Sequence, residues 1–296
     1  MSGNTASGDA SPGNTASRDA PKLFVSIELE GCTGVVTEGQ TEPGRPAWEG
    51  ARRLMRADLD AVIEGCRAGV AGEIVVCDAH DRGANLSAAD LPPAVRLVTG
   101  SPPPLGMMAG IDESFDAALF VGYHARAGTT GAVLDHTYTY RVFRVRVDDM
   151  IDAGEFALNT ALAGCFAVPV VFVSGDEAAV AEARELLPGV TGVAVKTGRA
   201  RTSARLLSCD HTRTLLRDGA QQALRALSPP AARPAALSWD ERSLRVVFTR
   251  SDFADAAAVC PGVERVDART IRLESPRFLS TFTTFVAALR LAAKVP

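Results

Sequence analysis

The sequence lacks three features that would assign it to a special class of protein. It has no apolar run of the roughly 20 residues that a membrane-spanning helix needs. It has no excess of basic charge, because 31 basic and 35 acidic residues give a formal net charge of −4, which argues against nucleic acid and anionic membranes as partners. It also has no apolar segment typical of a signal peptide. We therefore expect a cytoplasmic protein that acts on a small molecule or a peptide.

Paired cysteine spacings are also missing. The six cysteines occur singly along the chain, and none belongs to the closely spaced pairs of zinc knuckles or redox motifs. Several lie in strongly apolar stretches, as reduced thiols of cytoplasmic proteins commonly do. We predict that most of them are buried free thiols.

What the sequence does contain is a globular composition with one low-complexity end. Its 296 residues, 47% of them hydrophobic, suffice for one large or two ordinary domains. Residues 1–20 repeat a unit of small and polar residues and are predicted to form a disordered tail. Residues 21–200 are predicted to form an α/β catalytic domain that binds metal. Residues 201–296, with a helix, a Pro-rich linker and short strands, are predicted to form a smaller α+β domain.

Short apolar runs alternate with helical patterns in the first two thirds of the chain. Five of these runs are too continuously apolar to be strands with one solvated face: residues 22–30, 73–80, 95–100, 117–124 and 168–176. We predict that all five are buried on both faces. The predicted fold class is α/β, an open and mostly parallel sheet with helices on both faces, plus a smaller C-terminal α+β portion.

The connections between these runs have helical or antiparallel patterns. Apolar residues from Trp48 to Val70 recur at intervals of three and four, which predicts an amphipathic crossover helix. Two further helices are predicted at 154–166 and 176–187. The alternating pattern between 131 and 151 favours a hairpin or an antiparallel excursion.

Potential metal ligands stand at the ends of three predicted strands. Ligands collect at the carboxyl ends of strands in open α/β sheets, and a spacing of two puts Glu28 and Glu30 on one face of an extended chain. His80, His124 and Glu155 complete a set suited to zinc, manganese or cobalt. Five ligands exceed one tetrahedral site, whereas a two-metal site with a bridging carboxylate uses all of them.

Each of these residues also has a purely structural interpretation. Glu155 near a helix start is favoured by the helix dipole alone, and a histidine such as His136 can be a hydrogen-bonded strand residue. Asp78 is better interpreted as a partner that orients His80 than as a ligand. Three of only four histidines fall near predicted strand ends, and this coincidence favours a joint site.

Several long segments resemble, in order and spacing, the DppA family of D-aminopeptidases, the M55 metallopeptidases. They are KLFVSIELEGCTGV, VVCDAHDRGANL, ALFVGYHARAGTTGAVLDHTYTY and GEFALNTALAGCFAVPVVFVSGDE. The resemblance covers roughly residues 22–210 and fades in the last third of the chain.

The resemblance implies a zinc enzyme with a defined ligand set. Two zinc ions are held in that family by residues that correspond here to Glu28, Glu30, His80, His124 and Glu155. The catalytic histidine corresponds to His136. A ring-shaped homo-oligomer, a decamer, is also implied. One departure stands out, because family members usually have aspartate at Glu28, the position that bridges the two metals.

These observations predict a metal-dependent aminopeptidase or amide hydrolase acting on short peptides with a D-amino acid at the N-terminus. His136 would either transfer protons or attack the substrate directly. Alternatives are hydrolysis of another amide, such as a β-amino acid peptide or a biosynthetic intermediate, and a non-catalytic metal-binding assembly protein. A nucleotide-binding protein is disfavoured because EGCTGV lacks the G-x-G-x-x-G pattern.

Three polar residues in the family-like segments have an open role. Asn85, Arg126 and Asn159 could orient substrate or could hydrogen-bond neighbouring loops.

Overall fold

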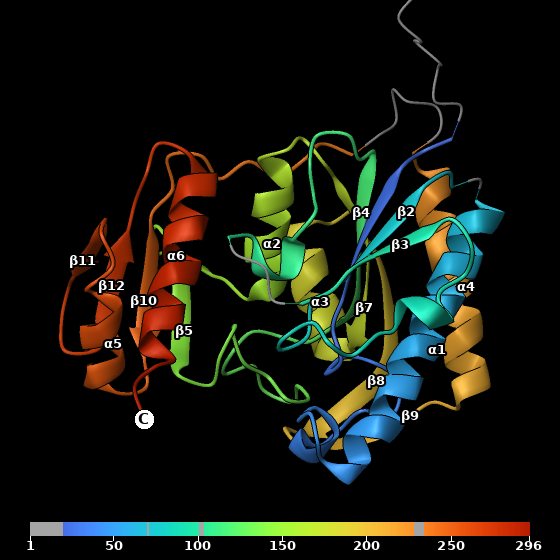
Figure 1. Ribbon diagram of the computed structural model, residues 1–296, viewed down its shortest axis with the longest axis horizontal. Helices are drawn as coiled ribbons and strands as arrows, with labels where there is room; N and C mark the ends of the chain where they lie inside the picture. Colours follow the sequence, from blue (N-terminus) through green and yellow to red (C-terminus); the bar gives the residue numbers. More distant parts are fainter. Residues whose placement is uncertain (1–19, 70, 101–103, 228–233) are drawn as a thin grey trace, which may run out of the picture.

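The computed structural model describes residues 20–69, 71–100, 104–227 and 234–296. The predicted disordered tail falls almost entirely on residues 1–19, which lie outside the described residues. Two β-sheets with helices between and around them make up the described part of the chain (Figure 1).

The larger sheet carries most of the predicted strands. Its strands are β1 (Leu23–Ile27), β2 (Ile74–Asp78), β3 (Val95–Val98), β4 (Ala117–Tyr123), β7 (Val170–Asp176), β8 (Thr191–Ala200) and β9 (Ser203–Leu206). They lie in the order β3-β2-β1-β4-β7-β8-β9, and all pair in parallel except β9, which is antiparallel to β8. The predicted α/β class with an open, mostly parallel sheet is confirmed.

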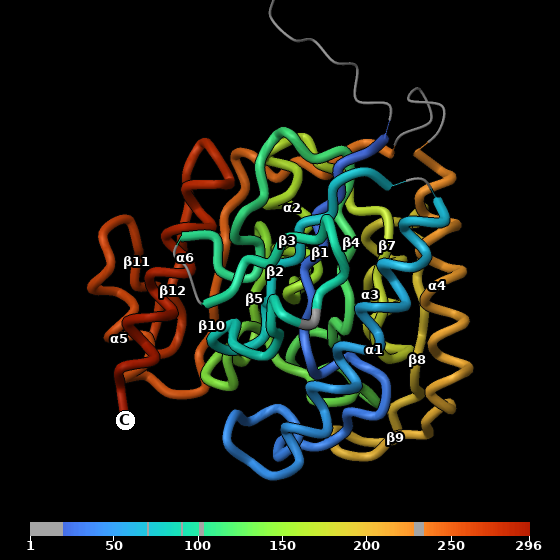
Figure 2. Tube along the Cα trace, turned by 45° about the vertical axis from the view of Figure 1, so that its right-hand side comes forward, coloured from blue at the N-terminus to red at the C-terminus, as the bar shows by residue number. Residues whose placement is uncertain are grey.

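Helices cover both faces of this sheet. On one face lie α1 (Pro46–Ala68) and α4 (Cys209–Arg225), which pack against each other. On the other lie α2 (Glu155–Gly164) and α3 (Glu177–Leu186), and this face looks toward the second sheet (Figures 1 and 2). The crossover helix predicted after the first strand is therefore confirmed as α1, and the two later helical patterns as α2 and α3.

The second sheet is antiparallel and smaller. Its strands are β5 (Val142–Val147), β6 (Ile151–Asp152), β10 (Leu244–Phe248), β11 (Val263–Arg265) and β12 (Thr270–Leu273), in the order β11-β12-β10-β5-β6. It is accompanied by α5 (Ser251–Ala257) and α6 (Phe278–Ala292). Three short 3-10 turns complete the described elements: η1 (Glu38–Gln40), η2 (Ala88–Asp90) and η3 (Gly106–Met108). The antiparallel excursion predicted near 131–151 corresponds to β5 and β6.

Each sheet uses chain segments from both sides of residue 200. The second sheet takes β5 and β6 from the earlier part, while α4 from the later part packs on α1. The predicted division at that residue stays a prediction. The prediction that β3 is buried on both faces was wrong, since its residues are only half-buried or exposed. The reason is that β3 forms the edge of the larger sheet, where no further described strand covers it.

The core is built by strand alternation. Leu23, Val25 and Ile27 of β1 pack with α1 and α4, whereas Phe24 packs on the opposite side. Four of the six cysteines are buried and all six are free thiols, as predicted. Among the described helices, none combines the length and hydropathy that crossing a membrane requires.

Consecutive strands run outward from the centre of the larger sheet in opposite directions. From β1 the chain proceeds to β2 and β3 on one side, and from β4 to β7 and β8 on the other. Such a reversal between neighbouring strands opens a crevice at their carboxyl ends, where ligands bind in open α/β sheets. The crevice between β1 and β4 is therefore the first place to examine for a site.

Candidate metal centre

The side chains predicted as ligands and catalyst converge in this crevice. Glu28 and Glu30 follow β1, His80 follows β2, His124 follows β4, Glu155 is the first residue of α2, and His136 lies in the connection from β4 to β5. The five predicted ligands are at most 6% exposed. Together with His136 they form two clusters, which we call the Glu28 group (Glu28, Glu30 and His80) and the His124 group (His124, His136 and Glu155).

The Glu28 group is held together by a histidine with a defined orientation. His80 Nε2 lies 2.7 Å from the carbonyl oxygen of Thr41, and a carbonyl can only accept, so this nitrogen donates. His80 Nδ1 then faces Glu30 Oε2 at 2.9 Å. Burial lowers the pKa of His80 but Glu30 outweighs it and raises the pKa to about 10. A proton thus sits between the two ligands, where a cation can replace it.

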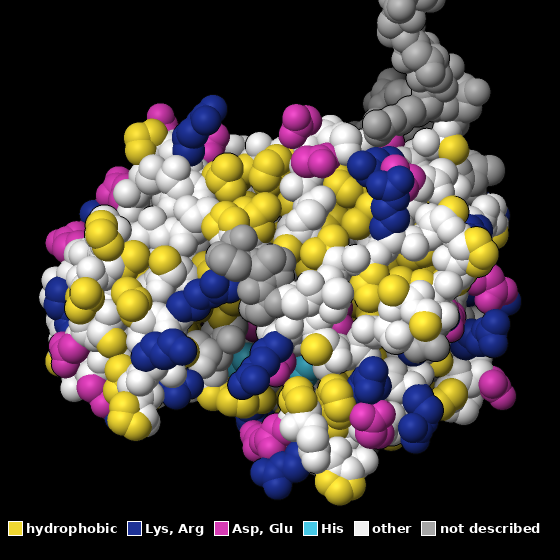
Figure 3. All heavy atoms as spheres, in the orientation of Figure 1, with side chains coloured by type: hydrophobic (Ala, Val, Ile, Leu, Met, Phe, Trp, Pro, Cys, Tyr) yellow, Lys and Arg dark blue, Asp and Glu magenta, His cyan; other side chains and the backbone are white. Residues whose placement is uncertain are grey.

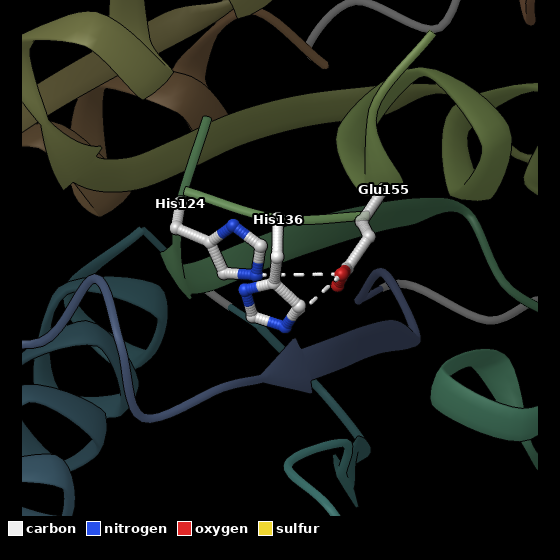
Figure 4. A group of neighbouring side chains, drawn as sticks. All are labelled: His124, His136 and Glu155. Atoms are coloured by element: carbon white, nitrogen blue, oxygen red, sulfur yellow. Dashed lines mark ion pairs between the residues drawn. The ribbon is translucent and has the colours of Figure 1, made fainter. Parts of the chain in front are cut away.

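The His124 group is arranged around one carboxylate. Glu155 Oε1 lies 3.4 Å from His124 Nε2 and 3.7 Å from His136 Nε2 (Figure 4). The two imidazole rings stack with centroids 4.0 Å apart. Their Nδ1 atoms face the carbonyl oxygens of Ala125 and Leu134, so both Nδ1 atoms donate and both Nε2 atoms are directed at Glu155. Burial lowers the pKa of His124, but Glu28 and Glu155 outweigh it and raise the pKa well above its usual value, so His124 Nε2 carries a proton that a cation would displace. The backbone N–H of Tyr138 donates to Glu155 Oε1 at 2.6 Å.

The buried donor atoms of these residues fit a metal. Glu28 Oε2 and His124 Nε2 form no hydrogen bond with the described residues, and Glu30 Oε2 is paired with the protonated His80. Leaving such groups unsatisfied is costly. Glu28 Oε2 also lies 3.4 Å from His124 Nε2, so it reaches from one group to the other. Carboxylate oxygens and imidazole nitrogens are the donors that zinc accepts.

The buried carboxyl groups of the centre have shifted pKa values. Burial, and then the nearby Glu155, raise the pKa of Glu28 above its usual value. Burial acts in the same direction on Glu30 and Glu155, but His80 and His124 respectively hold their pKa values well below the usual range. Divalent cations would displace the protons held between these groups and balance the charge of the carboxylates. Metal binding should therefore release protons and become stronger as the pH rises.

His136 differs from the other two histidines. Burial, followed by the neighbouring His124, lowers its pKa below the usual value. Its imidazole is consequently neutral at neutral pH. A neutral imidazole with an exposed Nε2 lone pair can take up a proton or act as a nucleophile.

Two glycines allow the ends of β1 and β4 to touch. The Gly31 N–H donates to the Gly122 carbonyl at 2.7 Å, and a Cβ on Gly31 would lie 2.0 Å from the carbonyl oxygen of Tyr123. Gly122 has a φ of +69°, and a Cβ there would lie 2.2 Å from the carbonyl oxygen of Glu28. This contact brings Glu28 next to His124. The glycines in EGCTG and VGYH were the available signal, and the sequence interpretation did not use them.

Asp78 supports His80 through an intermediate residue. Its carboxylate accepts hydrogen bonds from the backbone N–H groups of Asn85 and Leu86 and from the Asn85 side chain. The same Asn85 amide donates to the carbonyl of His80. Asp78 therefore orients the loop that carries His80 rather than the imidazole itself.

The other polar residues of uncertain role also have protein partners. Asn159 binds the hydroxyl groups of Tyr123 and Tyr138. Arg126 pairs with the buried carboxylate of Glu182. These contacts, like those of Asn85, favour the structural interpretation over substrate binding.

A cavity of about 440 Å³ opens beside the two groups. The metal centre forms one wall, and α6 forms another with Val286, Leu289 and Arg290. Histidine side chains are visible in the hollow between the two halves of the molecule (Figure 3). The sequence interpretation missed α6 as a wall of the site, because a helix that begins near residue 276 shows no polar motif that links it to the strand ends.

Comparison with known proteins identifies relatives across most of the chain. The family model described as D-aminopeptidase, peptidase M55, matches residues 22–287. The family resemblance thus extends beyond residue 210, where it was predicted to fade. A D-aminopeptidase of Bacillus subtilis is 31% identical over 280 residues, which cover 92% of this chain and 98% of the relative.

A solved structure gives the same result. The fold matches that of the Zn-dependent D-aminopeptidase DppA from Bacillus subtilis, described as a self-compartmentalizing protease, with a TM-score of 0.87 and 30% identity. The match covers 93% of this chain and 98% of that one. The chain therefore belongs to the M55 family of D-aminopeptidases.

Proposed function

We propose that this protein is a zinc-dependent aminopeptidase that hydrolyses short peptides, with a D-amino acid at their amino terminus. The observation that carries the proposal is the convergence of the Glu28 and His124 groups, in which buried carboxylate oxygens and imidazole nitrogens face one another. Its relatives are D-aminopeptidases, and one of them is described as Zn-dependent. Manganese and cobalt accept the same donors.

The two groups would divide the ligands between two ions. Glu30 and His80 would hold one ion, His124 and Glu155 the other, and Glu28 would bridge them, since its carboxylate reaches the His124 group. When bound, the two ions would supply Lewis acidity toward the substrate carbonyl and toward water.

His136 is proposed as the catalytic side chain. Because Leu134 holds the proton on Nδ1, Nε2 is free to accept a proton and later to give one to the leaving amine. The imidazolium formed in between faces Glu155, whose carboxylate stabilises the positive charge. Direct attack by Nε2 is the alternative role. Intact-mass measurement of enzyme quenched during turnover separates them, because only direct attack adds the aminoacyl mass to the protein.

The cavity suits a small substrate with a free amino group. Its volume of about 440 Å³ accommodates a short peptide. Outside the ligand set, Glu42 and Asp81 also line it, and their carboxylates favour a protonated amine. Apolar side chains of α6 on the opposite wall can contact a substrate side chain.

We further propose that the protein is cytoplasmic and assembles as a ring-shaped homo-oligomer, a decamer. The solved relative is described as self-compartmentalizing. Phe143 and Met150 in the β5–β6 region are 54% and 71% exposed, and burial in an assembly would remove this apolar surface from water.

The function is tested by metal analysis together with hydrolysis of D- and L-aminoacyl amides and a β-aminoacyl amide, with and without a chelator. We expect two zinc equivalents and chelator-sensitive hydrolysis of the D-compounds. Metal without hydrolysis of any compound would favour the non-catalytic alternative. Cleavage of the β-aminoacyl compound alone would identify β-amino acid peptides as the substrate class. Absence of metal would refute the proposal.

A further inference from the structure

Lys196 of β8 is a buried cation that contacts the chain just after the first ligands. The residue is 2% exposed. Its Nζ donates to three backbone carbonyl oxygens: those of Glu30 at 2.6 Å, Cys32 at 2.9 Å and Val35 at 2.6 Å. An ammonium group has three donors, so all of them are used to hold one loop.

The choice of lysine at this position is informative in this chain. Only three of the 31 basic residues are lysines, at positions 22, 196 and 294, and the rest are arginines. An ammonium is compact and directs its donors to the corners of a tetrahedron, whereas a guanidinium is a flat fork. Three carbonyls of one curled loop match the ammonium and not the fork.

The loop held by Lys196 carries two proposed metal ligands. One of the three carbonyls belongs to Glu30 itself, and the Glu28 carbonyl lies two residues earlier along the same chain. The loop is also held at Thr33, whose backbone N–H donates to the buried Asp58 at 2.8 Å. Its backbone is therefore set by side chains from β8 and α1 that contact no substrate or metal.

We propose that Lys196 is a positioning residue for the Glu28 group, which fixes the backbone from which the Glu28 and Glu30 carboxylates reach the metals. The inference rests on the proposed function. Three carbonyl acceptors surround Nζ, an arrangement that uses all three donors of the ammonium form. Its positive charge also offsets the negative charge gathered in the Glu28 group.

The neighbouring strand end provides a matched comparison. Asp176, which pairs with Lys196 in the sheet register, is 1% exposed and accepts the backbone N–H of Val133 at 2.6 Å. Val133 lies three residues before His136. Two adjacent buried charges thus hold different loops, one with metal ligands and the other with the proposed catalyst.

The test uses the full-length, metal-free protein with the variants Lys196→Met and Asp176→Asn, and with exposed Lys294→Met as control. Zinc binding is titrated by calorimetry, and backbone amide exchange is followed by mass spectrometry. For Lys196→Met we expect the affinity of one zinc site to fall roughly 100-fold and amide exchange at residues 31–35 to accelerate. For Asp176→Asn we expect zinc affinity to be retained while kcat falls, and Lys294→Met should match the wild type.

The outcomes separate this inference from the proposed function. Two zinc sites of unchanged affinity in Lys196→Met, with unchanged exchange at residues 31–35, would overturn the inference and leave the function standing. A wild-type protein that binds no zinc would overturn both. If Lys196→Met does not fold, Lys196→Gln replaces it, because the amide keeps two donors but no charge; the same comparison with the wild type then decides.

Discussion

The Glu28 group and the His124 group lie side by side but draw their side chains from different kinds of structure. The Glu28 group comes from the ends of two neighbouring parallel strands, β1 and β2. The His124 group combines the end of β4, a long connection and the start of α2. The first follows strands of a single sheet, whereas the second depends on the connection that also leads to β5 of the second sheet.

This difference separates binding from catalysis. The Glu28 group holds two carboxylates and a histidine tied to the Thr41 carbonyl, an arrangement suited to hold a cation. The His124 group adds His136, a neutral imidazole that faces the cavity. Changes in the first group should therefore act mainly on metal content, and changes at His136 mainly on turnover.

The largest effect is expected for His136→Ala. Removing the proposed proton carrier should lower kcat by roughly 1,000-fold while both metals remain bound, because five other ligands stay in place. Steady-state kinetics on samples of measured zinc content check this. A variant that lost a metal instead would show that His136 is a ligand, and the contrast between the groups would be broken.

Substitutions of Glu28 test the link between the groups. Glu28→Gln removes a negative oxygen donor, so we expect one zinc equivalent to be lost along with most of the activity. Glu28→Asp keeps the carboxylate and should preserve metal loading. Mass spectrometry of the native protein measures both. Two full zinc equivalents in Glu28→Gln would refute the bridging role.

A third change separates the groups physically. In Gly31→Ala the new Cβ would lie 2.0 Å from the Tyr123 carbonyl, so the ends of β1 and β4 must move apart. We expect the free energy of unfolding to fall by about 3 kcal/mol, measured by urea denaturation. Gly39→Ala is the control, because nothing lies within 4 Å of its Cβ. Equal stability of the two variants would show that the close contact between the ends of β1 and β4 is not required for stability.

The smallest expected effect is on the pH dependence of the activity. Because burial and then His124 lower the pKa of His136 below its usual 6.5, the neutral form persists into mildly acidic solution. The activity should be present above this lowered pKa and be lost as the pH falls through it. A profile of kcat/KM on zinc-saturated enzyme should place the acidic limb below pH 6.5. A limb above that value would point to another group.

The strand-end residues could be predicted because each follows a continuously apolar run. Glu28, His80 and His124 owe their convergence to the parallel sheet, and its pattern is local in the sequence. The stacking of His136 on His124 could not be predicted, because it depends on a loop in which Leu134 has a φ of +52° and Asp176 holds Val133.

Prediction of the fold from the sequence was limited in the same way, to elements with a strong local pattern. Buried strands with strong apolar runs were predicted, but β8 is mostly half-buried and its pattern was too weak to recognise. Lys196 was missed with it. Pairing between β5 and β10 links distant parts of the chain, and a local sequence pattern does not predict such a pairing.

That pairing has a consequence for the order in which the protein matures during synthesis. All proposed ligands precede residue 156, so they are synthesised within the first two thirds of the chain. The wall formed by α6 belongs to the last segment translated, and long-range strand pairing forms late in folding. A nascent chain on the ribosome therefore contains all of its proposed metal ligands before α6 is made, and a product truncated before α6 would contain the ligands without this wall of the cavity.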